Sequence, residues 1–470
     1  MADEARAVPL NDSAALGRLR ERLVQEGHLT FAAFMAEALY GPEGYYTRRP
    51  RLGGASADFF TSPELHPAFG ALLGRLAARV WSALGQPDRF DLVEHGPGTG
   101  VLSRDLLAWA DHAAPAFAAC VRYRLIETSP ALQALQQETV TAAGLLDGRI
   151  SWAELPPLSR LRERGSGGEG YVGEGEFLAR PTVGLTLANE LVDALPVHLV
   201  AMRDGTLYER YVVLDADRRD GLGWREDEPS TPALTAYFER LGVWPGDGSI
   251  AEVNLHGVTW MEEAAASLDR GALLVLDYGY PAPELYAPSR RFGTLLTYRG
   301  HALGSDPLRH VGEKDITAHV DFTSLARAGE RAGLDTVGLI GQAALLRRLG
   351  LDGYLHKLDH AALSATDHDA NRRALLALVE PTGLGNVQGL LQTRGLPGFD
   401  PFAPDAGAPD GTADTRAPDG SWLPLLRPGQ MRLPGPLEAE GFIDLDAQWQ
   451  EFLSECADDA AADSDPAPPP

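Results

Sequence analysis

Cysteine is almost absent from this sequence of 470 residues, which contains only Cys120 and Cys456. Two cysteines this far apart cannot make a disulfide framework, so we expect a protein of a reducing compartment, the cytoplasm. Because Cys and His form no cluster, we expect no metal site. No run approaches the ~20 apolar residues of a membrane span, and the first twenty residues lack the apolar centre of a signal peptide. The sequence therefore predicts a soluble protein without membrane insertion.

Positive charge is also scarce, since 41 Lys and Arg residues face 66 Asp and Glu residues, giving a net charge of -25. This balance disfavours nonspecific binding to nucleic acid, which depends on cationic neutralisation of phosphates. Two interpretations remain, because an acidic surface keeps a protein soluble and also favours encounter with a basic partner. Composition leaves the oligomeric state open, including a homodimer.

The length of the chain favours a principal domain with a second lobe or large insertions. Composition and pattern divide it into five parts. We expect an N-terminal helical lobe in 1–85, the first part of the core in 86–200 with a flexible insert at 159–181, a hairpin-containing insertion in 201–260, the rest of the core with a substrate lobe in 261–398, and a largely flexible extension rich in Pro, Asp and Ala in 399–470.

Strand and helix patterns alternate from residue 90 onward. Apolar runs predict strands at 90–96, 123–129, 148–154, 182–190 and 271–279, and helical spacing predicts helices at 101–110 and 131–140. This alternation is typical of an α/β fold with a mostly parallel, doubly wound sheet. Outside this core, Gly41 and Pro42 should end a helical stretch, and Asp204-Gly205 should form a tight hairpin.

Three glycines follow the first predicted strand, in the stretch "HGPGTGVL". Glycines at a turn between a strand and a helix let the backbone approach a ligand and leave helix N-terminal amides free. Gly96, Gly98 and Gly100 form G-x-G-x-G, whereas the dinucleotide fingerprint requires G-x-G-x-x-G, and position 101 is Val. The spacing therefore disfavours a dinucleotide-dependent oxidoreductase, and a tight turn without a ligand is the structural alternative.

Two acidic residues indicate which cofactor this turn would hold. Glu94 lies two residues before the first glycine, where it would repel a pyrophosphate but favour the cationic S-adenosylmethionine. Glu127 ends the second predicted strand, where a carboxylate can accept hydrogen bonds from both hydroxyls of a ribose. A solvated strand end is the alternative interpretation of Glu127.

The fourth predicted strand of the core ends in "NELVDALPVH", which places Asn189, Glu190 and Asp193 at the edge of the sheet that carries reactive groups in open α/β folds. Two acids and an amide offer several acceptors to a donor-rich cation such as a guanidinium. We assign all three to a candidate catalytic site, with Asn189 also near the cofactor. Alternatively, Asn189 caps a turn and the acids are solvated.

Seven stretches occur in the order typical of one family: "GYY", "DFFTSPE", "LVEHGPGTGVL", "LIETSPAL", "NELVDALPVH", "LLVLDYGY" and "ITAHVDFT". On these stretches the chain resembles the MidA-type S-adenosylmethionine-dependent methyltransferases over roughly residues 15 to 398. The resemblance implies a class I, Rossmann-like methyltransferase fold. It also implies methyl transfer to an arginine of a protein partner, because the mitochondrial member is a complex I assembly factor that methylates a complex I subunit.

The same resemblance implies further site residues. The segment before the glycine turn helps to cover the cofactor in the family, which here corresponds to Gly44, Tyr45, Tyr46, Thr61, Ser62, Pro63 and Glu64. We assign Thr61, Ser62 and Pro63 to the cofactor, and Tyr45, Tyr46, Glu64, His198 and Asp321 to the substrate.

Local chemistry offers other interpretations of several of these residues. The tyrosines could serve core packing. Asp321 ranks first as the cap of a helix that begins at Phe322, and His198 as a structural histidine. Thr99 stands where the mitochondrial member has a basic residue, and the insert and the extension have no clear counterpart in the family.

The sequence thus predicts a methyltransferase that uses S-adenosylmethionine, without a metal, to modify an arginine of a protein partner, and the family resemblance suggests a respiratory NADH dehydrogenase subunit as that partner. The enzyme would chiefly supply orientation and electrostatic fit for an in-line displacement. A noncatalytic assembly factor that binds the cofactor remains an alternative, and a dinucleotide-dependent oxidoreductase is a weaker one.

Overall fold

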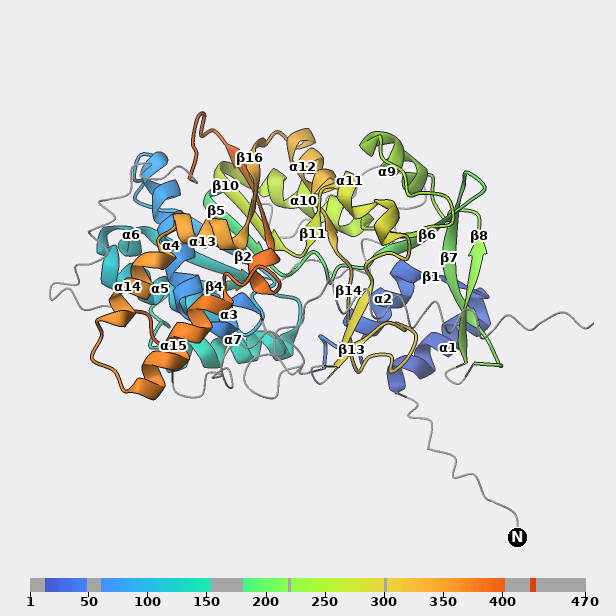
Figure 1. The fold of residues 1–470 in the computed structure, drawn as a ribbon, viewed down its shortest axis with the longest axis horizontal. Helices are drawn as coiled ribbons and strands as arrows, with labels where there is room; N and C mark the ends of the chain where they lie inside the picture. Colours follow the sequence, from blue (N-terminus) through green and yellow to red (C-terminus); the bar gives the residue numbers. More distant parts are fainter. Residues whose placement is uncertain are drawn as a thin grey trace, which may run out of the picture.

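The computed structural model describes residues 13–48, 61–153, 181–218, 221–299, 302–401 and 423–427. A large α/β core and a smaller lobe lie side by side (Figure 1). Most of the predicted insert at 159–181 and most of the extension after residue 399 fall outside the described residues. Among the described residues, no helix is both long and apolar enough to cross a membrane.

The core contains a seven-stranded sheet that confirms the predicted doubly wound architecture. Its strands lie in the order β16-β17-β10-β5-β2-β3-β4, and the five from β10 to β4 run parallel. The two antiparallel strands at one edge come from late in the chain. The bounds are β2 (Phe90–His95), β3 (Val121–Ile126), β4 (Ile150–Ala153), β5 (Thr182–Asn189), β10 (Leu268–Asp277), β16 (Asp335–Gly341) and β17 (Gln388–Arg394).

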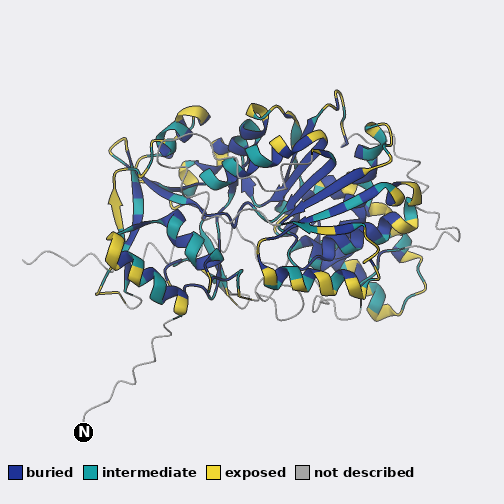
Figure 2. Cartoon of the chain, turned by 180° about the vertical axis from the view of Figure 1, so that it is seen from behind, coloured by how far each residue is buried: buried dark blue, intermediate teal, exposed yellow. Residues whose placement is uncertain are grey.

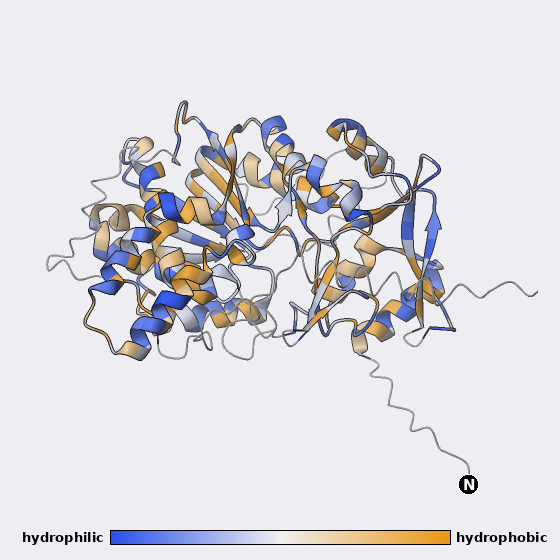
Figure 3. Cartoon of the chain, viewed as in Figure 1, coloured by the Kyte–Doolittle hydropathy of each residue, from blue (hydrophilic) through white to orange (hydrophobic). Residues whose placement is uncertain are grey.

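Helices cover both faces of this sheet because the strands are apolar on both sides. Alternate residues of β5 and β10 point to opposite faces of the sheet. Leu187 and Leu274 pack on one face with α4 and α5, whereas Ala188 and Val275 pack on the other face with α10 and α12. Figures 2 and 3 show these strands as the buried and hydrophobic centre of the core. The core helices are α3 (Ser62–Leu65), α4 (Ala68–Ala83), α5 (Val101–Ala113), α6 (Pro115–Cys120), α7 (Pro130–Ala142), α10 (Leu255–Ser267), α12 (Phe322–Arg331), α13 (Gln342–Arg348), α14 (Leu351–Asp359) and α15 (Ala365–Ala377).

The smaller lobe is built from segments that are distant in the sequence. An antiparallel sheet runs β1-β7-β6-β9 with β8 beside β7, and it carries the predicted hairpin, in which Asp204 (φ 50°) and Gly205 (φ 73°) join β6 to β7. The N-terminal helices share one hydrophobic core with this sheet, since Leu19 and Phe34 cluster with Val212. The elements are α1 (Ala14–Glu26), β1 (Leu29–Thr30), α2 (Phe31–Tyr40), β6 (His198–Arg203), β7 (Thr206–Leu214), β8 (Leu222–Asp227), α9 (Ala233–Leu241) and β9 (Ile250–Val253).

Shorter elements connect the two parts. They are β11 (Gly279–Tyr280), α11 (Ala282–Leu285), β12 (Leu296–Arg299), β13 (Ala302–Gly304), β14 (Asp315–Thr317) and β15 (Val320–Asp321). As predicted, α2 ends at Tyr40, immediately before Gly41 and Pro42.

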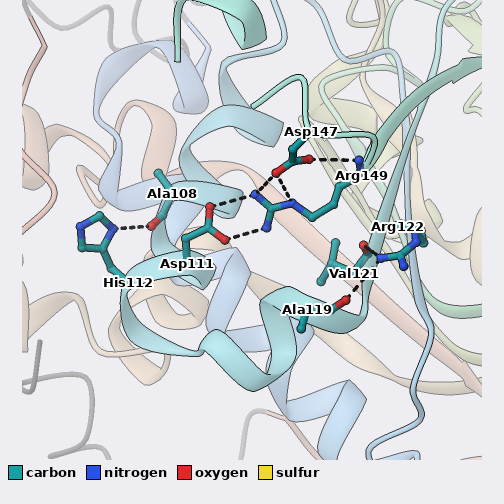
Figure 4. A network of polar contacts seen from close by, with 8 residues as sticks. All are labelled: Ala108, Asp111, His112, Ala119, Val121, Arg122, Asp147 and Arg149. Atoms are coloured by element: carbon teal, nitrogen blue, oxygen red, sulfur yellow. Dashed lines mark hydrogen bonds and ion pairs between the residues drawn. The ribbon is translucent and has the colours of Figure 1, made fainter. Parts of the chain in front are cut away.

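An ion-pair network fixes the edge of the sheet at β4. Arg149 binds both carboxylate oxygens of Asp111 on α5, at 2.6 and 2.9 Å, and also binds Asp147 at 2.8 Å (Figure 4). The two carboxylates stabilise the charged guanidinium and raise the pKa of Arg149. All three charges are mutually satisfied, so this cluster has a structural role.

Part of the C-terminal extension packs on the core, although the sequence predicted a largely flexible segment. Leu423, Leu425 and Leu426 contact the main hydrophobic cluster. The guanidinium of Arg427 lies 2.9 Å from Asp105 on α5. Because these contacts join positions 322 residues apart, the local Pro-rich composition did not predict them.

Candidate functional site

A cavity of about 1200 Å³ lies between the core and the smaller lobe. It opens at the carboxyl ends of β2, β3 and β5, where an open parallel sheet places its ligands. The core contributes the glycine turn, Glu127 and the start of the loop after β5, whereas the lobe contributes α2 and the beginning of β6. One cavity therefore contains residues from most of the stretches that the sequence singled out.

The glycine turn takes a backbone conformation that favours glycine. Gly96, Gly98 and Gly100 have φ values of 65°, 52° and 80°, and Gly100 caps the start of α5. A Cβ on Gly96 would lie 2.8 Å from Leu191 Cδ1, whereas a Cβ on Gly98 would meet no described atom within 4 Å. Since Gly98 lines the cavity, a side chain there would project into space that a ligand can use.

Glu127 follows β3 and lines the cavity. Its Oε1 accepts a hydrogen bond of 2.8 Å from the Ser129 amide, and its Oε2 accepts one of 3.1 Å from Gln136 Nε2. Gln136 also donates to the Gly98 carbonyl at 2.9 Å, so one side chain joins the predicted ribose acceptor to the glycine turn. Burial raises the pKa of Glu127, although these donors oppose the effect. Sequence reasoning missed Gln136, because nothing local distinguishes it from other polar positions of α7.

Glu94 also lines the cavity, from within β2. The Tyr123 hydroxyl donates a hydrogen bond of 2.8 Å to Glu94 Oε2, yet burial raises the pKa of Glu94 to about 7. A carboxylate whose ionisation is opposed by burial gains most from a bound cation.

The loop after β5 presents Asn189 and Glu190 to the cavity. Glu190 has a φ of 50°, an uncommon left-handed conformation for a residue other than glycine. Its Oε1 accepts hydrogen bonds from the Ser62 amide and from Asn189 Nδ2, both at 3.1 Å, and no described group donates to its Oε2. Burial raises the pKa of Glu190 to about 8, and the nearby Asp277 adds to the shift. Asn189 Oδ1 is buried and accepts no hydrogen bond from the described residues.

Asp277 holds this loop in place, and sequence reasoning missed it. Its Oδ2 accepts hydrogen bonds from the amides of Leu191, Val192 and Asp193 at 3.2, 2.8 and 3.3 Å, and the side chain is fully buried. Burial raises the pKa of Asp277 to about 7. The position of Asp277 at the end of β10, directly beside β5, was the one available signal.

Asp193 differs from its neighbours, because it is not among the described residues that form the cavity wall. Its side chain is buried. Burial, reinforced by the carboxylates of Asp277 and Asp315, raises the pKa of Asp193 well above its ordinary value. The structure thus brings Asp193 to the acidic cluster behind the cavity.

The short helix α3 closes one side of the cavity. Thr61, Pro63 and Glu64 line it, whereas Ser62 is buried and donates to Gln342 Oε1 at 3.1 Å. The Thr99 hydroxyl of the glycine turn donates to the Glu64 carboxylate, whose pKa is raised by burial. Position 99 therefore links α3 to the turn.

Tyr45 and Tyr46, which the family resemblance assigned to the site, lie in different environments. Tyr46 lines the cavity, and its hydroxyl donates to Asp315 Oδ1 at 3.0 Å. Tyr45 belongs to the hydrophobic core of the smaller lobe and is not among the described wall residues, which is the packing role that sequence reasoning weighed. Gly44 lets the chain turn tightly, because a Cβ there would lie 2.6 Å from the Leu39 carbonyl carbon.

Asp321 and His198 also differ in their position relative to the cavity. Asp321 caps α12 through the amides of Thr323 and Ser324, at 2.9 and 3.1 Å, and is not among the described residues of the cavity wall. The helix cap expected first is therefore present, and the structure does not bring Asp321 to the site. His198 does line the cavity, with its Nδ1 2.7 Å from Glu209 Oε1.

The cavity residues fit S-adenosylmethionine. Gly98 leaves space beside the backbone, Asn189 Oδ1 is a buried acceptor to which none of the described residues donates, and carboxylates with raised pKa values surround the same space. These features suit a ligand with ribose hydroxyls, an ammonium and a sulfonium. In the described part of the chain, no group of three or more His, Cys, Asp or Glu residues is arranged to hold a metal ion.

Comparison with known proteins agrees with this chemistry. The model of the S-adenosyl-L-methionine-dependent methyltransferase family Methyltransf_28 matches residues 72–340. The protein arginine methyltransferase NDUFAF7, mitochondrial, of Mus musculus is 30% identical over 354 residues, which is 72% of this chain and 74% of the mouse protein. The protein of the same name from Homo sapiens is 29% identical over 394 residues, covering 79% of this chain and 81% of its own length.

A solved structure extends the similarity to three dimensions. A COG1565 superfamily member from Burkholderia thailandensis, bound to S-adenosyl-homocysteine, has 28% sequence identity and a TM-score of 0.71. The similarity covers 84% of this chain and 97% of the solved one. The glycine turn, Glu127 and the loop after β5 all lie inside the range that the family model matches.

Proposed function

The chain belongs to the S-adenosyl-L-methionine-dependent methyltransferase family Methyltransf_28, and from this premise we propose that it methylates an arginine side chain of a protein. One observation carries the choice of arginine. Glu190 is a buried carboxylate that lines the cavity, is held by Ser62 and Asn189, and has a second oxygen to which no described group donates. A guanidinium offers several N-H donors in one plane and matches such a carboxylate.

Different residues of the chain would bind the cofactor and assist the methyl transfer. Glu127 and the glycine turn hold the ribose and the amino-acid portion of the cofactor. When bound, S-adenosylmethionine supplies an electrophilic methyl group on a sulfonium. Glu190 orients the guanidinium and draws its positive charge away from the attacking nitrogen, which frees the nitrogen's electron pair for an in-line displacement.

Proton balance also favours Glu190. Attack by a guanidinium nitrogen releases one proton, which must move to a base in the site. A bound guanidinium would favour the ionised form of Glu190, and a carboxylate whose pKa is raised to about 8 is, once ionised, a stronger base than an ordinary Glu. Asp193, which lies behind the cavity wall, would act only through Glu190.

The partner follows from two lines of support. The mouse and human relatives carry the name protein arginine methyltransferase, and the net charge of -25 favours a basic protein partner. We propose a subunit of the respiratory NADH dehydrogenase, complex I, as the substrate. We also propose that the protein encounters this substrate in the cytoplasm.

Mass spectrometry tests this proposal directly. NADH dehydrogenase subunits from cells lacking this gene are incubated with the protein and methyl-labelled S-adenosylmethionine, and arginine residues are examined for added methyl groups. Transfer by the wild-type protein and its loss in Glu190→Gln are expected. Cofactor binding without transfer would instead identify a noncatalytic assembly factor.

A further inference from the structure

The wall of the cavity continues from the glycine turn into the smaller lobe, and the part lined by His198 and His256 is here called the second arm. Small pockets for single ligands occupy roughly 300 to 1,000 Å³, and the cavity here is larger, at about 1200 Å³. The loop 190–198 contributes to the wall on both sides, because Glu190, Ala194 and His198 all line the cavity. With the cofactor on the core side, the second arm is the part of the cavity that remains for a methyl acceptor.

A histidine and a glutamate form a buried pair in the wall of the second arm. His198 Nδ1 lies 2.7 Å from Glu209 Oε1, and the side chain of Glu209 is fully buried. Glu209 Oε2 also accepts hydrogen bonds from the Ser230 amide at 2.6 Å and the Tyr211 hydroxyl at 3.2 Å. Burial would raise the pKa of Glu209, but the bond to His198 and the other donors outweigh it and lower the pKa.

The contact with Glu209 determines which nitrogen of His198 is available to a ligand in the cavity. An ionised carboxylate can only accept, so His198 Nδ1 carries the proton and Nε2 is the remaining atom. No described group bonds to Nε2, and the ring is 12% exposed. Glu209 therefore positions the ring so that Nε2 remains for a hydrogen bond with a ligand.

A second histidine, on α10, is also held through its Nδ1. His256 also lines the cavity, and its Nδ1 donates to the Pro196 carbonyl at 2.9 Å. Burial, assisted by the nearby His198, lowers the pKa of His256 to about 4, so the ring is neutral and its Nε2 is an acceptor. Two imidazoles, each anchored through Nδ1, thus line the same part of the cavity.

Charged groups on the same wall are largely paired with one another. Glu37 lies 2.9 Å from Arg18, and Glu262 lies 2.8 Å from Arg331. Those carboxylates are therefore less available to a ligand than the two imidazoles.

We propose that His198, positioned by Glu209, and His256 form a subsite whose ring nitrogens hydrogen-bond with the polypeptide segment flanking the methylated arginine. The inference rests on the proposed function, and it assigns the second arm to the protein substrate rather than to the cofactor. In this arrangement, the target side chain extends to Glu190 while its main chain and neighbours lie against the imidazoles. Glu209 is a positioning residue, because it acts through His198.

Steady-state kinetics separate this role from a structural one. Methyl transfer to the isolated NADH dehydrogenase subunit is compared for the wild type, His198→Phe, His198→Gln, Glu209→Gln and the control His368→Phe. His368 is also paired with a carboxylate, Asp359 at 3.4 Å, but is not among the described residues of the cavity wall. We expect His198→Phe to raise KM for the protein by about tenfold, the effect of one lost hydrogen bond. Its kcat and its S-adenosyl-homocysteine affinity should stay close to wild type.

His198→Gln should recover part of the KM, because its amide can form a hydrogen bond in place of Nε2, and Glu209→Gln should fall between wild type and His198→Phe. An unchanged KM in His198→Phe would overturn the subsite. A loss of cofactor affinity and thermal stability together would assign the pair a structural role and overturn it equally. Absence of transfer by the wild type would refute the proposed function itself and is recognised separately.

Discussion

The amide of Ser62 donates a hydrogen bond of 3.1 Å to Glu190 Oε1, although the two residues are 128 positions apart. This contact joins the short helix α3, which covers the cavity, to the loop after β5. Because the donor is a main-chain N-H, the carboxylate is held without a neutralising cation. Burial opposes the ionised form of Glu190, so a cationic ligand would favour it.

Glu127→Ala should weaken binding of S-adenosylmethionine by roughly 1.5 to 3 kcal/mol, the value of a hydrogen bond to a charged group. Isothermal calorimetry measures the affinity, and circular dichroism checks that the fold is retained. Glu138→Ala on the same helix as Gln136 is the matched control, because Glu138 does not line the described cavity wall. Equal affinities of Glu127→Ala and wild type would remove Glu127 from the site.

Gly98→Val should abolish cofactor binding, because its side chain would project into the cavity from a backbone with φ 52°. Gly144→Val is a matched control, since Gly144 has φ 72°, also has no described atom within 4 Å of its Cβ position, and lies outside the described cavity wall. Both variants carry backbone strain, but only the first blocks the ligand. Retained binding in Gly98→Val would show that the turn is purely structural.

Glu190→Gln should reduce methyl transfer by about 100-fold or more while leaving cofactor affinity nearly unchanged, since one transition-state electrostatic partner is lost. Single-turnover rates on a verified protein substrate provide the measurement. Asp193→Asn should have a smaller effect, because Asp193 is not among the described residues of the wall. A wild-type rate in Glu190→Gln would direct attention to Asp193.

The stability of the cofactor-free protein should fall as pH rises from about 5 to 8. The pKa of Glu190 rises from 4.5 to about 8 on folding, so the folded state retains a proton that the unfolded chain releases in this interval. Each pH unit above 4.5 then costs up to about 1.4 kcal/mol, until the pH passes the folded pKa. Glu190→Gln should show a shallower decrease of Tm across the same range. Parallel pH profiles of the two proteins would show that Glu190 does not titrate in this way.

Asp277→Ala should lower the free energy of unfolding by roughly 2 to 4 kcal/mol, because it leaves buried amides of the loop without an acceptor. It should also abolish methyl transfer by releasing the loop that carries Glu190. Glu252→Ala removes another buried carboxylate that accepts main-chain N-H bonds, from Thr294 and Leu295, but Glu252 lies outside the described cavity wall. Thermal unfolding and transfer assays of the two variants should agree on stability and differ in activity. Normal transfer in Asp277→Ala would contradict the positioning role.

The sequence by itself determined the features that depend on local chemistry. Alternating apolar runs predicted the core strands, and Gly96, Gly98 and Gly100 marked a turn because their positive φ values favour glycine. Asp321 was recognisable as a helix cap, since an Asp immediately before a helix satisfies amides two and three residues ahead.

Only the tertiary structure decided which distant segments meet. A buried face in a sequence pattern shows that a strand or helix must pack, but not against which partner. For this reason three contacts could not be predicted. They are the shared core of the N-terminal helices and the β6–β7 hairpin, the pairing of His198 with Glu209, and the hydrogen bonds from the loop after β5 to Asp277. The same limit applies to Tyr45 and Tyr46, which are adjacent in sequence, yet one packs in the core and the other lines the cavity. Their environments are set by contacts with elements far along the chain, which local spacing does not encode.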